Sequence, residues 1–130
     1  MYSDKQLGEE FGLDPPTVGK IFASMKVKRQ GKEYNVGLKV KSSSRMVYNP
    51  EWVQRQGKKW YYGENARSAL AEYVKLFPKI VEAIRNAKGM YFDFDDDDEL
   101  KRCYEWAKAF RKRTYKRIDV RTGEDLTGVK

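Results

Sequence analysis

The segment of residues 4–25 constrains the fold most strongly, because its apolar residues fit two short helices that cross. These residues recur at the intervals of three and four that bury one face of a helix. They are Leu7, Phe11, Leu13, Val18, Ile21 and Phe22. Gly8 fits the close approach of the two helices, and Gly12 fits a left-handed residue that ends the first helix. Asp14 and Pro15 fit the cap and the first position of the second helix.

The pairs Leu7-Gly8, Thr17-Val18 and Lys20-Ile21, with Phe11-Gly12-Leu13 between them, have the spacing of a known DNA-binding motif. The segment resembles the helix-turn-helix of small bacterial and phage regulators, and it covers about a sixth of the chain. The resemblance implies that the second helix enters the major groove of DNA. The residues alone also fit an ordinary helical hairpin, or a helix-turn-helix that binds protein.

The exposed side of the second predicted helix departs from this pattern. Its hydrogen-bonding side chains are those of Thr17, Lys20 and Ser24. It has no Arg, Asn or Gln, the residues that form two hydrogen bonds to one guanine or adenine. We therefore expect weak direct reading of the base sequence by this helix.

The charges of the chain are strongly segregated. The net charge is +8, and residues 26–62 carry ten basic and two acidic residues. Residues 100–117 carry eight basic residues and one acidic residue, whereas residues 91–99 sum to −6. Two basic blocks of this density favour a polyanionic partner, because bound phosphates release their counterions.

The first basic block contains a predicted hairpin. Apolar residues alternate with polar ones from Tyr34 to Val40, a turn is expected at 42–44, and a return strand is expected over 45–48. In a winged helix-turn-helix such a hairpin lies against the DNA backbone. The expected phosphate contacts are Lys26, Lys28, Arg29, Lys39, Lys41 and Arg45. A plain hairpin that covers the core explains the same pattern.

The second half of the chain predicts helices. Residues 64–88 form an apolar stripe that Pro78 should kink or split, and a second helix is expected over 97–117. The run of acidic residues at 93–99 fits the start of that helix better than a metal site, because carboxylates there complement the helix dipole. The C-terminal half of the second helix is a basic amphipathic stretch suited to phosphates. We expect residues 118–130 to be frayed.

The composition argues against several kinds of enzyme. The chain has no histidine, and its single cysteine, Cys103, lies on the apolar side of a predicted helix. Histidine-dependent catalysis, Cys-based zinc sites and internal disulfides are therefore excluded. No stretch approaches a membrane span or a signal-peptide core. These features predict a cytoplasmic protein that is not an enzyme and has no cofactor, no metal site and no membrane partner.

Taken together, these patterns predict a mainly α fold with a small β-hairpin (α+β). The predicted architecture is a winged helix-turn-helix followed by two further helices. Residues 1–62 would form the winged helix-turn-helix, and residues 63–130 a helical extension that packs on it or joins two subunits. The expected partner is double-stranded DNA, and the expected function is transcriptional regulation of bacterial or phage type. Two alternatives stay open: a phage-type inhibitor that docks on a host polymerase or nuclease, and a non-specific nucleic-acid-binding protein.

Overall fold

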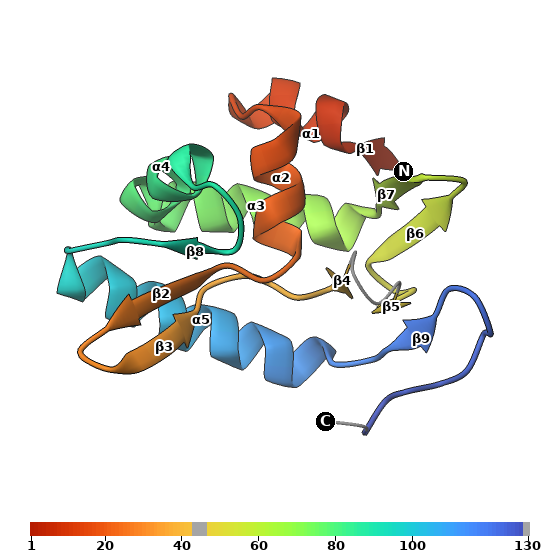
Figure 1. Ribbon diagram of the computed structural model, residues 1–130. Helices are drawn as coiled ribbons and strands as arrows, with labels where there is room; N and C mark the ends of the chain where they lie inside the picture. The colour runs from red at the N-terminus through yellow and green to blue at the C-terminus, as the bar shows by residue number, and fades with distance from the viewer. Residues whose placement is uncertain (43–46, 129–130) are drawn as a thin grey trace.

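The computed structural model describes residues 1–42 and 47–128, which form an α+β fold (Figure 1). Its helices are α1 (Asp4–Phe11), α2 (Pro15–Phe22), α3 (Glu64–Leu76), α4 (Pro78–Asn86) and α5 (Asp97–Thr114). Its strands are β1 (Tyr2–Ser3), β2 (Lys26–Arg29), β3 (Lys32–Asn35), β4 (Lys41–Ser42), β5 (Val47–Tyr48), β6 (Val53–Gln56), β7 (Lys59–Tyr62), β8 (Tyr91–Phe92) and β9 (Ile118–Asp119). These strands form three small sheets, ordered β1-β7-β6, β3-β2-β8 and β4-β5-β9.

Helices α1 and α2 form over the two segments that the sequence predicts, although Asp14, the N-cap residue of α2, makes no side-chain cap hydrogen bond. Ser3 caps α1: its hydroxyl accepts a hydrogen bond from the backbone N–H of Gln6 at 3.1 Å. Gly12 ends the helix with a φ of 71°, which confirms the predicted left-handed residue. A Cβ at Gly8 would collide with the backbone carbonyl of Leu13, so Gly8 allows a close approach to the turn between the helices rather than to the second helix itself.

The segment after α2 differs from the prediction. A two-residue turn at Gln30 and Gly31, with φ values of 52° and 78°, joins β2 to β3 in an antiparallel hairpin that the sequence did not predict. Residues 36–40 then leave the sheet. The backbone N–H groups of Leu38, Lys39 and Val40 donate to carbonyls at the C-terminal end of α2, which have no partner within the helix. The alternation from Tyr34 to Val40 therefore reflects a segment that caps α2.

Two further pairs of strands follow. β4 and β5 are antiparallel, with Ser42 opposite Val47, so Ser42 is paired in a strand although it was expected in the turn, whereas Val47 lies in the expected return strand. Arg45 and the rest of residues 43–46 lie outside the described residues. β6 and β7 pair across a turn at Gly57, and β7 directs Trp60 and Tyr62 into the core.

Pro78 divides the predicted 64–88 helix into α3 and α4. Phe77, between them, has φ and ψ of −129° and 57°, outside the helical range. This confirms the predicted effect of a ring that blocks the helix and removes an amide. α4 can therefore turn away from α3 and lie beside α2 (Figure 1).

The last helix, α5, is shorter than predicted and ends at Thr114. Its buried seam is Leu100, Cys103, Ala107 and Phe110, and Trp106 packs edge-on against Tyr73 and Phe77. Burial raises the pKa of the Cys103 thiol to about 12, as expected for a core residue. The expectation that residues 118–130 fray is wrong for the described part, because β9 pairs with β5 and the Leu126 N–H donates to the Arg117 carbonyl at 2.7 Å.

The hydrophobic core is one cluster that draws on both halves of the chain. Leu7 and Ile21 from the first helices lie in the same cluster as Tyr73, Ile84 and Phe110 from the last three. The helices are therefore held in fixed positions around the small sheets. Among the described residues, no helix combines the length and the apolar character needed to cross a membrane.

A buried carboxylate joins α5 to α4. Glu99 is 4% exposed, and its Oε2 accepts a hydrogen bond from the backbone N–H of Ile80 at 2.6 Å. The N-cap residue of α4, Phe77, supplies no side-chain cap, so Glu99 satisfies an amide of the first turn from another helix.

We expect Glu99→Ala to lower the free energy of unfolding by about 1–3 kcal/mol, because it leaves a buried amide unsatisfied. Urea denaturation measures the change. The exposed Glu105, on the same helix, provides the control, and Glu105→Ala should stay within about 0.5 kcal/mol of the wild type. Equal stability of the two variants would contradict this role of Glu99.

Candidate nucleic-acid interface

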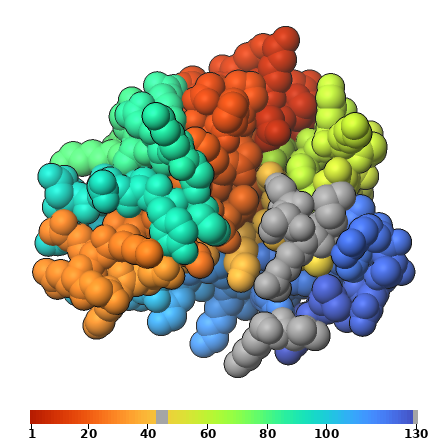
Figure 2. Space-filling view, in the orientation of Figure 1, coloured from red at the N-terminus to blue at the C-terminus, as the bar shows by residue number. Residues whose placement is uncertain are grey.

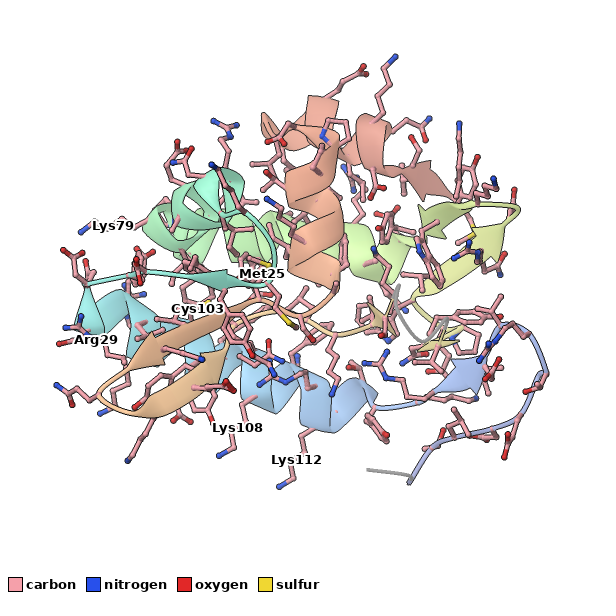
Figure 3. The ribbon with its side chains drawn as sticks, viewed as in Figure 1. Met25, Arg29, Lys79, Cys103, Lys108 and Lys112 are labelled. Atoms are coloured by element: carbon pink, nitrogen blue, oxygen red, sulfur yellow. The ribbon has the colours of Figure 1, made fainter. Side chains whose placement is uncertain are left out.

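The two basic blocks of the sequence lie side by side in the structure. The β2–β3 hairpin packs along α5, where Tyr34 meets Tyr104 edge-on with ring centroids 5.1 Å apart. The hairpin and α5 together occupy the lower side of the molecule in Figure 2. Lys108 and Lys112 extend from α5 away from the body of the protein (Figure 3). The side of α5 that faces away from the core is therefore a cationic surface.

The acidic run neutralises the opposite end of α5. Arg29 of the hairpin pairs with Asp97 at 2.7 Å, Lys79 with Asp96 at 2.7 Å, and Arg102 with Asp98 at 3.1 Å. Asp96 also caps α5 by accepting from the Glu99 N–H. Among the described residues, no group of three or more His, Cys, Asp or Glu side chains is placed to hold a metal ion. Toward the C-terminal end of α5 the described residues show one such ion pair, between Lys116 and Glu51 at 3.5 Å, so the positive charge there is less neutralised.

The cap at Asp96 makes stability depend on pH in a defined direction. The Lys79 ammonium and the Glu99 N–H hold the pKa of Asp96 below its ordinary value of 3.8. A depressed pKa contributes stability above the unfolded-state pKa, and that contribution is lost as pH falls through the folded-state pKa.

In Asp96→Asn the cap is kept but the group no longer titrates. The variant should therefore be less stable than the wild type at neutral pH, and the difference should shrink as the pH falls below 3.8. Thermal unfolding at a series of pH values measures this difference. A difference that stays constant into the acid range would contradict the assignment.

The structure places the expected base-reading residues of α2 against the rest of the protein. Thr17 has no exposed surface, and its hydroxyl donates to Asp14 Oδ1 at 2.6 Å. The Lys20 ammonium donates to the carbonyls of Ala87 at 2.7 Å and Ile84 at 3.3 Å, at the C-terminal end of α4. Ser24 is half-buried. Helix α4 lies beside α2, and α2 is therefore part of the core packing in the described structure.

The expected phosphate contacts are scattered. Lys26 is half-buried in β2, Lys28 is exposed with its ammonium 4.7 Å from the centre of the Tyr91 ring, and Arg29 pairs with Asp97. Lys41 is only 5% exposed, and this burial lowers its pKa. The buried Lys41 side chain therefore does not lie on the solvent-facing side of a hairpin, where the sequence predicts it.

Lys39 differs from the other expected contacts, because it lies at the edge of a cleft. The cleft has a volume of about 750 Å³ and lies between the C-terminal end of α5, the 35–42 segment and the tail. Its lining residues are Asn35, Lys39, Ser42, Val47, Arg111, Lys112, Thr114, Tyr115, Lys116, Arg117 and Leu126. Five of these are Lys or Arg, and none is Asp or Glu, so the lining attracts anions.

Several contacts fix the walls of the cleft. Nη1 of Arg111 donates to the carbonyls of Asn35 at 2.9 Å and Gly37 at 2.6 Å, which ties α5 to the 35–42 segment. The side-chain amide of Asn49 donates to the Thr114 carbonyl at the end of α5. Lys39 adopts a left-handed conformation with a φ of 53°, which is uncommon for a residue with a Cβ. The backbone segments that carry the side chains of the cleft are therefore held in fixed positions.

Arg117 is the least exposed of the five cationic residues that line the cleft. It is 5% exposed, and neither Nη1 nor Nη2 has a hydrogen-bond partner in the part of the chain that the structure describes. Burial lowers the pKa of its guanidinium, although an arginine keeps its charge in proteins. Sequence reasoning did not select Arg111, Lys112, Lys116 or Arg117 as site residues. The charge of the 100–117 block was the signal that pointed to them.

A comparison with family models matches residues 2–127 to the exoribonuclease Xrn1 D2/D3 domain. A comparison with curated proteins gave no match. The family match covers almost the whole chain, whereas the helix-turn-helix resemblance covers about a sixth of it.

This match corrects the functional interpretation of the sequence. The assignment to winged helix-turn-helix regulators of bacterial or phage type is wrong, because the matching family is a domain of an RNA-degrading enzyme. Transcriptional regulation and double-stranded DNA as the partner are wrong for the same reason. The expectation that the protein is not an enzyme is also contradicted, because the matching family is a domain of an exoribonuclease. With residues 2–127 matched, the chain belongs to the family of the exoribonuclease Xrn1 D2/D3 domain.

Proposed function

We propose that this chain binds RNA for an exoribonuclease and that its contact with the phosphate backbone is the cleft at the end of α5. The observation that carries the proposal is the lining of the cleft, with five Lys or Arg side chains and no carboxylate. Such a lining favours phosphates whatever the base sequence. Because the chain belongs to an exoribonuclease family, RNA is the polyanion that we propose for the cleft.

The surface leading to the cleft supports an extended ligand. Lys108 and Lys112 are one helical turn apart on α5, about 6 Å along its axis, and both point outward (Figure 3). Tyr115, at the end of the helix, is 41% exposed and lines the cleft. Single-strand-binding proteins use cations along the path of the nucleic-acid backbone, together with aromatic rings on which bases stack. An RNA ligand is also consistent with a cytoplasmic place of action.

The residues that line the cleft supply Lys and Arg side chains, which bind anions. The cleft lining has no carboxylate that would ligate a metal ion or act as a general base. The contribution proposed for this chain is therefore to hold the RNA in place.

The test is the salt dependence of RNA binding, measured by fluorescence anisotropy with a labelled oligouridine. Each cation that contacts a phosphate contributes about 0.7 to the slope of log K against log salt for a single strand. We expect Lys112→Ala to reduce this slope by about 0.7. Lys39→Asn should reduce it similarly, and Asn tolerates the left-handed backbone at this position.

Lys5 provides the matched control, because it is exposed on α1, at the opposite end of the molecule from α5 (Figure 1). Lys5→Ala should leave the slope unchanged. A wild-type protein that does not bind oligouridine at low salt, or equal slopes for Lys5→Ala and Lys112→Ala, would refute the proposed site.

A further inference from the structure

An acidic segment lies at the edge of the cationic cleft. After β9 the chain returns as a loop toward the end of α5 (Figure 1), and residues 121–127 of this loop are here called the strap. Leu126 of the strap lines the cleft, and Glu124 and Asp125 directly precede it. The strap therefore brings negative charge beside a lining in which no residue is acidic.

Lys116 is the cleft cation that this negative charge attracts. Hydrogen bonds from the side chain and the backbone N–H of Thr127 hold the pKa of Asp125 below its ordinary value of 3.8, and the Lys116 ammonium lowers it further. Lys116 also pairs with Glu51, with Nζ 3.5 Å from Oε1. A phosphate that binds Lys116 must therefore compete with carboxylates of the chain itself.

Short local pairings hold the strap in place. The Leu126 N–H donates to the Arg117 carbonyl at 2.7 Å, and the Arg117 N–H donates to the Thr127 hydroxyl at 3.1 Å. Every residue of the strap except Leu126 is exposed. A segment with exposed backbone hydrogen bonds and little buried apolar surface can open without unfolding the core.

The closed strap also holds Arg117 in an unfavourable position. Both backbone groups of Arg117 bond to the strap, and its terminal nitrogens are buried without an acceptor among the described residues. A buried charge without a partner opposes the arrangement that buries it. When the strap opens, the Arg117 backbone is released and the guanidinium can turn toward water. The burial of Arg117 thus favours opening.

We infer that the strap is an autoinhibitory segment of the RNA-binding cleft: in the closed form Asp125 competes with an RNA phosphate for Lys116, and bound RNA displaces the strap. This inference rests on the proposed function. Within it, the strap lowers the affinity of the cleft for phosphates, because RNA must replace the contacts that the strap makes.

The experiment compares Asp125→Asn with the wild type by oligouridine anisotropy at several salt concentrations. Asparagine keeps the Oδ1 that accepts from the Thr127 N–H at 2.8 Å, and it removes the charge. We expect the affinity to rise about 2- to 5-fold at low salt, the range for one exposed ion pair. The gain should disappear at high salt, because exposed charges are screened.

Asp119→Asn is the matched control. The Asp119 carboxylate also accepts from backbone N–H groups of the following turn, and its ion pair is with Arg121, which does not line the cleft. This variant should bind oligouridine like the wild type. An equal gain for both variants would overturn the inference, because any lost negative charge would then have the same effect.

A double-mutant cycle identifies the group on which Asp125 acts. In a Lys116→Ala background Asp125→Asn should leave the affinity unchanged, because the cation for which the carboxylate competes is absent. A gain of the same size in both backgrounds would contradict competition for Lys116.

Hydrogen exchange of the wild type measures displacement of the strap without any variant. The Leu126 amide should exchange severalfold faster when oligouridine saturates the protein. The Leu13 amide, bonded to the Gly8 carbonyl at 2.8 Å in the turn after α1, is the control and should be unaffected. Unchanged or slower exchange at Leu126 would show that bound RNA leaves the strap closed, which overturns the displacement.

These outcomes separate the inference from the proposed function. If oligouridine binds and Lys112→Ala reduces the salt slope, but Asp125→Asn binds no tighter than the wild type, the inference is overturned and the proposed function stands. If the wild type does not bind oligouridine at low salt, both are overturned.

Discussion

Arg117→Met is expected to unfold at a higher urea concentration than the wild type. The terminal nitrogens of the guanidinium are buried without a hydrogen-bond partner among the described residues, and the contact of the group with the Tyr115 ring offsets only part of the lost solvation energy. Methionine fills a similar volume without a charge. We expect a gain of about 1–3 kcal/mol in the free energy of unfolding, the scale of an unsatisfied buried polar group.

The control for this prediction is Arg113→Met, which removes a charge from the same helix. Arg113 is exposed, and its guanidinium carbon lies 5.6 Å from the centre of the Phe110 ring. The change should stay within about 0.5 kcal/mol. If Arg117→Met instead lowers the stability by more than 1 kcal/mol or so, the guanidinium has a structural role in the fold.

Gly37→Ala is expected to destabilise the protein by about 3 kcal/mol, the upper range for overpacking. A Cβ at Gly37 would lie 2.8 Å from the Met25 amide nitrogen and closer still to the Ala23 carbonyl oxygen. Both are backbone atoms at the junction of α2 and β2, so they cannot move aside as a side chain would. Gly37 also accepts a hydrogen bond from Arg111, so its displacement should weaken RNA binding too. Urea denaturation and oligouridine anisotropy measure the two effects.

Gly19→Ala makes the same chemical change and should have the opposite effect on stability. Gly19 lies within α2, and a Cβ there would meet only side-chain atoms, Lys41 Nζ at 3.7 Å and Asp4 Oδ1 at 3.9 Å. Alanine should then add up to about 1 kcal/mol of helix propensity. Destabilisation of similar size by both substitutions would show that the close packing around Gly37 is not the cause.

Local structure was largely predictable from the sequence. The helix end at Gly12, the break at Pro78 and the acidic cap of α5 each depend on a few neighbouring residues, and each was found. The turn at Gln30 was missed, because glutamine rarely adopts the positive φ that it has there.

The role of α2 could not be read from its own residues. The spacing of apolar residues and glycines that resembles a helix-turn-helix is what any two short crossing helices require. Only the packing of α4 shows that Lys20 caps another helix at Ala87 and Ile84. That packing depends on the direction of the chain after Pro78, and no local sequence pattern predicts this direction.

The cleft was predictable in part. The charge of the 100–117 block pointed to phosphates, and the structure places Lys112, Lys116 and Arg117 of that block together. The burial of Arg117 was not predictable, because it depends on the tail returning through Leu126 and Thr127. The glycines of that tail, Gly123 and Gly128, predicted fraying instead.

The most direct test of the account is to map the RNA contact on the protein by NMR. Backbone amide resonances of the ¹⁵N-labelled chain are followed as unlabelled oligouridine is added. We predict that the largest shifts fall in the segments 111–117 and 35–42, which supply most of the cleft lining, and in the tail around Leu126. Shifts confined to α1 and α2, or to the β6–β7 hairpin, would contradict the assignment of the cleft as the RNA-binding site.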